Sequence, residues 1–144
     1  MVITANSLYD KGRDAFMKGS IAGGSQGWLG ATVKVMLVSS YAINLAADTF
    51  KSDIPNAQIA AVSTYLTQKI TLGNGVADAT QTVIPGVSWA ATILYLVGFV
   101  DSGASNTSLL IWADDTASVL PALLNAGLDL TISWDPGTSR IFKL

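Results

Sequence analysis

Residues 128–144, LDLTISWDPGTSRIFKL, contain the strand pattern that decides the fold class. Apolar residues recur there at every second position: Leu128, Leu130, Ile132 and Trp134. Asp135-Pro136-Gly137 is a turn signal, because Pro presets φ near about −65° and Gly accepts the positive φ that follows. Residues 140–144 are again rich in strand formers. The pattern predicts a terminal hairpin that closes a β-sheet.

The same alternation recurs in ATVKVMLVSS, residues 31–40. Val33, Val35 and Leu37 fall on one side of this segment, and Lys34 and Met36 fall on the other, which predicts a half-buried strand. Further strand-like runs follow at spacings of about 8–15 residues, separated by turn signals. This rhythm favours an antiparallel sandwich or barrel over alternating βα units.

Residues 79–100 carry no charge and are nominally long enough to span a membrane. Pro85-Gly86 interrupts this run, and its flanks are Asp78 and Asp101 rather than the Lys or Arg typical of membrane segments. We therefore expect a buried strand or strand pair here and no membrane partner.

The N-terminal region predicts the only helix. Ser7-Leu8-Tyr9-Asp10 fits a Ser-x-x-Asp cap, Asp14 and Lys18 form an i, i+4 pair, and Gly19 offers a left-handed stop. A glycine-rich stretch follows over residues 19–30, in the wrong order relative to helix and strand for a phosphate-binding loop.

The expected organisation is therefore one domain over residues 1–144. It has a helix at about 7–18, a Gly-rich loop over 19–30, and a β region over 31–144 that closes with the C-terminal hairpin. The predicted fold class is mainly β: an antiparallel β-sandwich or a jelly-roll-like barrel of about 7–9 strands with one short N-terminal α-helix.

The amino-acid composition argues against catalysis and against metal or phosphate binding. The chain has no His, no Cys and no Glu, so the usual general bases and transition-metal ligands are missing. Asp114-Asp115 is the one adjacent acidic pair, and it lacks the spaced oxygen ligands of a calcium loop. Eight scattered basic residues and a net charge of −2 give no patch for phosphates. We expect that the chain is not an enzyme and that it binds no cofactor, metal, nucleic acid or small-molecule substrate.

Charge is the unusual quantity. Asp, Lys and Arg make up 12% of the chain, against about 25% in an average protein. Two explanations stay open: neighbouring subunits cover much of the surface, or the surface is rich in small polar residues. Apolar residues near expected loops are the candidate interface: Leu8, Tyr9, Phe16, Trp28, Leu29, Trp112, Ile141, Phe142 and Leu144. For the aromatic residues of the chain, packing in the core is the alternative.

Three stretches together resemble a family of small virion structural proteins of tailed bacteriophages. The first is ANSLYDKGRDAF, and the second is WLGATVKVMLV followed by Tyr41, INLA and SDIP. The third combines LLIWADDTASVLP, NAGLDLTISWDPG and the final IFKL. The chain departs from the family at AGGSQG, which looks inserted, and residues 58–87 match only in their rhythm of strands and turns.

Within that family the chain looks most like a head decoration, or capsid cement, protein. The resemblance implies a small homo-oligomer, expected to be a trimer, on the outside of the phage head. Its partners would be its own copies and the major capsid protein, and it would be made in the bacterial cytoplasm. Two alternatives stay open: a tail-tip or fibre-associated module that recognises a host surface glycan, and a tail or neck subunit.

Overall fold

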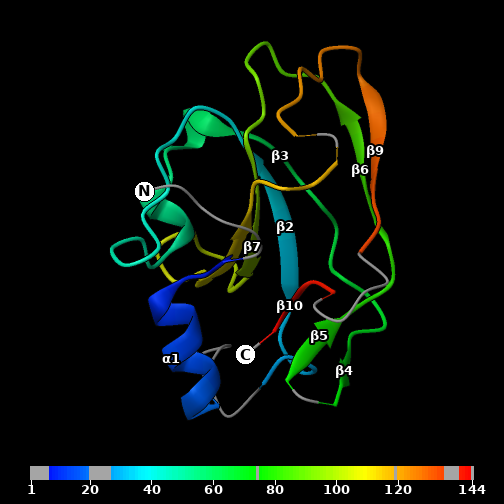
Figure 1. The fold of residues 1–144 in the computed structure, drawn as a ribbon. Coiled ribbons are helices and arrows are strands. Elements are labelled where there is room, and N and C mark those ends of the chain that lie inside the picture. The colour runs from blue at the N-terminus through cyan, green and yellow to red at the C-terminus, as the bar shows by residue number, and fades with distance from the viewer. Residues whose placement is uncertain (1–6, 20–26, 74, 119, 135–139, 144) are drawn as a thin grey trace.

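The computed structural model describes residues 7–19, 27–73, 75–118, 120–134 and 140–143 (Figure 1). Antiparallel strands dominate, with one α-helix, which confirms the mainly-β prediction. The sheets do not close into a barrel, so the arrangement is sandwich-like. The elements are β1 (Ser7–Leu8), α1 (Asp10–Lys18), β2 (Val33–Val38), β3 (Ile59–Val62), β4 (Ile70–Leu72), β5 (Val76–Asp78), β6 (Thr82–Val87), β7 (Tyr95–Val100), β8 (Leu110–Asp114), β9 (Leu128–Ile132) and β10 (Phe142–Lys143), with short 3₁₀ turns η1 (Lys51–Asp53) and η2 (Asn56–Gln58).

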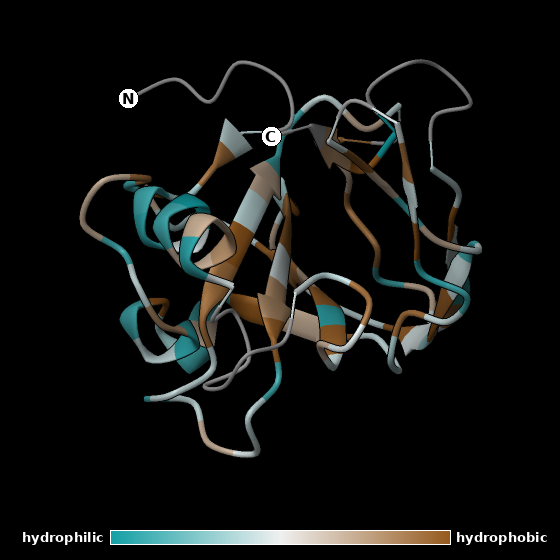
Figure 2. Ribbon diagram, turned by 90° about the horizontal axis from the view of Figure 1, so that it is seen from below, coloured by the Kyte–Doolittle hydropathy of each residue, from teal (hydrophilic) through white to brown (hydrophobic). Residues whose placement is uncertain are grey.

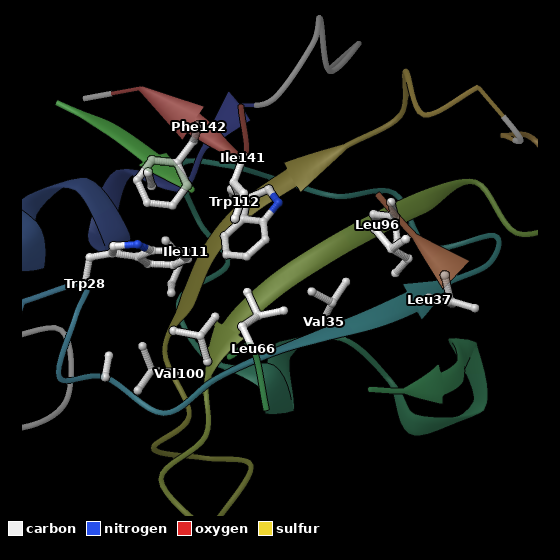
Figure 3. Close-up of a cluster of buried hydrophobic side chains, with 14 of the residues drawn as sticks. Trp28, Val35, Leu37, Leu66, Leu96, Val100, Ile111, Trp112, Ile141 and Phe142 are labelled. Atoms are coloured by element: carbon white, nitrogen blue, oxygen red, sulfur yellow. The ribbon is translucent and has the colours of Figure 1, made fainter. Parts of the chain in front are cut away.

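The strands form three antiparallel sheets. The largest has the order β1-β8-β7-β2-β3, the second has the order β10-β5-β4, and the third contains only β6 and β9. One hydrophobic core contains residues of all three sheets, and Figure 3 shows part of it. A smaller core lies on the opposite face of the five-stranded sheet. Figure 2 shows hydrophobic residues along the central strands and mainly hydrophilic ones on the helix.

The alternation in β2 is confirmed. Val33, Val35 and Leu37 enter the larger core, and Met36 and Val38 enter the smaller one. The strand is nevertheless not half-buried, because both of its faces are covered. It pairs with β7 on one side and β3 on the other, and the segment that includes Ile43 and Ile54 packs over its second face.

The predicted terminal hairpin is wrong. β9 pairs with β6, where Ile132 faces Thr82, whereas β10 pairs with β5, where Phe142 faces Ala77. The two segments therefore belong to different sheets, and the turn sequence between them lies outside the described residues. Burial is consistent with the separation, because beside β5 the side chain of Phe142 is 1% exposed and its ring contacts Trp28 in the aromatic core.

The helix begins later than expected. Ser7–Leu8 forms β1 against β8, and Tyr9 precedes the helix without a side-chain cap. The Tyr9 N–H donates to the Ile111 carbonyl at 2.9 Å, which continues the contact with β8 and delays the first helical turn. The helix ends at Gly19, whose φ of 65° confirms the left-handed stop, and Lys18 pairs with Asp14 at 2.7 Å as predicted.

Within the part of the chain that the structure describes, no helix is long and apolar enough to cross a membrane. The long uncharged run divides instead into strands β6 and β7. β7 lies inside the largest sheet, between β8 and β2, as expected for a strand with little charge.

Candidate interaction surface

The structure places most of the predicted interface residues inside the chain's own core. Six of them are buried: Leu8, Tyr9, Trp28, Trp112, Ile141 and Phe142. Their side chains hold this fold together and are not available to a partner, which corrects the prediction for them. Phe16 is half-buried, Leu29 is 59% exposed, and Leu144 lies outside the described residues.

Aromatic rings form the centre of the larger core. Figure 3 shows Phe142 together with Trp28 and Trp112. Between ring centroids, Phe142 lies 5.3 Å from Trp28, 5.6 Å from Trp112 and 5.3 Å from Phe16. Trp112 also meets Trp134 edge-on at 6.3 Å. Such tilted and edge-on contacts stabilise a core beyond the area they bury. Of the two roles considered for the aromatic residues, these rings have the second one, which is packing in the core.

The tryptophans offer no open stacking platform for a sugar. None of the four is exposed, and two donate their ring N–H within the chain. Trp28 Nε1 donates to the Ile70 carbonyl at 3.0 Å, and Trp134 Nε1 donates to the Thr80 carbonyl at 3.0 Å. A glycan-binding site built on exposed tryptophan therefore finds no support among these residues.

Two tyrosines and one aspartate lie in or next to the smaller core. The Tyr41 hydroxyl donates to Asp48 Oδ1 at 2.9 Å, and the Asn44 N–H donates to Asp48 Oδ2 at 2.8 Å. Burial and the hydrogen bond to Asp48 raise the pKa of Tyr41 to about 12. Burial also raises the pKa of Tyr9, whose hydroxyl has no hydrogen-bond partner. Both phenols are protonated near neutral pH and are unsuited to act as bases there.

Several of the few charged residues of the chain form ion pairs with one another. Lys34 Nζ lies 2.6 Å from Asp101 Oδ2 and 4.6 Å from the centre of the Tyr65 ring. Arg140 pairs with Asp78 at 3.3 Å, and two further pairs lie on α1. These four pairs involve eight of the 18 charged residues. Ten charged residues of the chain lie outside these four pairs.

Asp114, in the acidic pair near the end of β8, takes part in a local turn. Asp114 Oδ1 accepts hydrogen bonds from the Thr116 N–H and hydroxyl, each at 2.7 Å, and so closes a local turn. Among the residues that the structure describes, no group of three or more His, Cys, Asp or Glu side chains could hold a metal ion.

Large exposed apolar side chains mark the candidate surface. In the described chain these are Met17, Leu29, Tyr65, Ile70, Val83, Leu123 and Leu128. Leu128, 70% exposed, faces Val87 at one end of the β6–β9 ladder. Leu123, 56% exposed, lies nearby, since the Leu124 carbonyl accepts a hydrogen bond from the Trp89 N–H just beyond β6. Neither residue was among the predicted interface residues, and the alternation of residues 128–134 had placed Leu128 on a buried face.

No protein-family model matches this sequence, and no curated protein is significantly similar to it. We therefore infer function from the surface of the described residues. That surface combines little charge with separate exposed apolar side chains and open strand edges. Single exposed apolar side chains are normal on a protein surface, whereas an open strand edge can pair with a strand of another chain.

Proposed function

We propose that this chain is a non-enzymatic structural protein of a tailed-phage virion. It binds the outside of the head lattice as a small homo-oligomer and stabilises the shell, as a decoration or cement protein does. The observation that carries this proposal is the charge-poor surface with large exposed apolar residues such as Leu123 and Leu128. The resemblance of three sequence stretches to phage virion proteins supplies the kind of particle.

Binding alone is enough for this role. A protein that binds the mature shell and not its precursor stabilises the mature state by mass action. Many copies, each joined to its neighbours and to the lattice, make the attachment far stronger than one contact. The partners are therefore other copies of this chain and the major capsid protein. The absence of His, Cys and Glu from the sequence fits a role that requires no acid–base catalysis.

The test uses phage heads that lack this chain. The purified chain is added to immature and to expanded heads, bound protein is separated by sedimentation, and copies per particle are counted by gel densitometry. We expect saturation at hundreds of copies on expanded heads, with heads that resist heat better afterwards. A few copies per complete virion, all on the tail, would favour the tail-tip or neck alternatives and would contradict the proposal.

A further inference from the structure

The two-stranded sheet β6–β9 has an open edge along β9. In the described part of the chain, β6 is the only strand that pairs with β9. Figure 1 shows β9 at the right-hand side of the molecule, with no other labelled strand beyond it. Two strands alone make a weak sheet, and an open edge presents unpaired N–H and C=O groups to any neighbouring strand.

The two edges of this sheet differ in their protection. β6 carries Pro85, which lacks an N–H, and its pairing with β9 shifts register between Ile84 and Val87. Proline and bulges are the features by which natural proteins block edge pairing. β9, LDLTI, contains no proline, no glycine and no lysine, and its register along residues 130–132 is regular. Neither outer edge of this sheet has a pairing strand among the described residues, and the β9 edge lacks the proline and the glycine that β6 carries.

The other outer strands are less suited to pairing. β1 and β10 have two residues each, β4 has three, and β3 has four beside a register shift in β2. β9 has five residues, and Leu128 at its start is 70% exposed. Greater length and an uncovered apolar side chain therefore coincide on this strand.

We propose that β9 pairs antiparallel with β9 of a second copy of this chain, around a twofold axis beside Leu130. The result is a four-stranded sheet of order β6-β9-β9-β6 that spans two subunits. The proposal rests on the self-association included in the proposed function, and it specifies the contact and its symmetry. A twofold contact of this kind gives dimers, in place of the trimer that the sequence resemblance implies.

Charge favours an axis at Leu130 over an axis at Asp129. The outer face of β9 bears Asp129 and Thr131, and Leu128, Leu130 and Ile132 share the other face. A twofold axis at Asp129 would set two like charges opposite each other, which is unfavourable. An axis at Leu130 places Asp129 opposite Thr131 of the second copy and Leu128 opposite its Ile132. This register separates the carboxylates and covers the exposed Leu128 side chain.

Cysteine cross-linking tests this register directly, because the chain has no cysteine of its own. Residues directly opposite each other in an antiparallel pair have Cα atoms about 4.5–5.5 Å apart, which suits a disulfide, whereas diagonal neighbours are about 7–8 Å apart. Asp129→Cys and Thr131→Cys are prepared separately, oxidised alone and as an equal mixture, and resolved on a non-reducing gel. Ser52→Cys, an exposed position on η1, measures random collision.

We expect the mixture to form linked dimers at several times the yield of either variant alone. Efficient linking of Asp129→Cys alone, or of Thr131→Cys alone, would overturn the register. Linking no better than that of Ser52→Cys in all three samples would overturn β9 pairing altogether.

A charged substitution separates this proposal from the proposed function. Leu128→Lys places a cation on the first residue of the pairing strand, and Met17→Lys is the matched control on α1, where Met17 is 82% exposed. We expect the wild-type chain and Met17→Lys to be dimers by light scattering, and Leu128→Lys to dissociate at least tenfold more readily with an unchanged melting curve at low concentration. A Leu128→Lys variant that stays as associated as Met17→Lys, or a trimeric wild type, would overturn β9 pairing while head binding could still hold. A chain that neither associates nor binds heads would overturn both.

Discussion

Gly98 on β7 lies against the indole ring of Trp112 on β8, its direct partner across the ladder. A Cβ atom built at position 98 would overlap the Trp112 ring, so only glycine leaves room for the side chain there. Trp112 is 1% exposed and contacts Trp28, Trp134 and Phe142. The absence of a side chain at Gly98 therefore leaves room for the Trp112 ring in the core.

Gly98→Ala is expected to destabilise the chain by about 1–3 kcal/mol, the usual cost of overpacking a core. The measurement is the free energy of unfolding in urea, followed by tryptophan fluorescence. Gly73→Ala is the control, because a Cβ there meets nothing within 4 Å. Equal stability of the two variants would show that Trp112 does not occupy this position.

Gly12→Ala tests the seat of α1 on β8. Alanine in place of glycine normally favours a helix by about 0.5–1 kcal/mol. Here a Cβ would lie 2.7 Å from the Leu110 carbonyl oxygen, and backbone atoms of Ile111 lie nearby. We therefore expect a net loss of stability in thermal unfolding. A raised melting temperature would contradict the described contact.

The Lys34–Asp101 pair predicts a pH dependence. The hydrogen bond from Lys34 lowers the pKa of Asp101, and the bond to Asp101 raises the pKa of Lys34. The lowered carboxyl pKa stabilises the fold above about pH 4, and this contribution is lost as the pH falls through the folded value. The raised lysine pKa stabilises the fold below about pH 10, and that contribution is lost as the pH rises through the folded value.

Asp101→Asn is accordingly expected to lower the free energy of unfolding at pH 7 and to differ little from the wild type near pH 2. Urea titrations at several pH values measure the difference. Asp14→Asn is the matched control, because its pair with Lys18 is exposed and contributes little. A constant difference across the whole pH range would exclude the carboxylate as its cause.

Tyr41→Phe removes a donor to the buried Asp48 carboxylate. Hydrogen bonds to charged groups contribute about 1.5–3 kcal/mol, and we expect a loss in that range. Ultraviolet titration should also lose one phenol that ionises near pH 12 in the wild type. Tyr65→Phe, at an exposed position, serves as the control for stability. Unchanged stability and an unchanged titration curve would contradict this contact.

Local pattern was sufficient for some elements. Alternation identified β2 with the correct faces, and Asp14, Lys18 and Gly19 identified the end of the helix. These features depend on residues close together in the sequence, where period and capping act directly. The overall mainly-β class followed from the same short-range signals.

Long-range pairing could not be predicted in this way. Phe142 pairs with Ala77 and Ile132 with Thr82, and each strand might equally have joined its neighbour in sequence. The choice between such pairings depends on how the side chains of distant strands fill the core together. The two-residue alternation of a single strand carries no information about that packing. The same limit explains the interface prediction. Trp28 and Trp112 were expected near loops, but both fill the core, and Trp112 lies in the middle of β8. Leu128 follows the alternation of β9 and is nevertheless exposed.

Sedimentation of the purified chain with phage heads that lack it is the decisive measurement for the proposed role. We expect a self-associated protein that binds expanded heads at hundreds of copies per particle. A stable monomer that remains in the supernatant at every head concentration would contradict it.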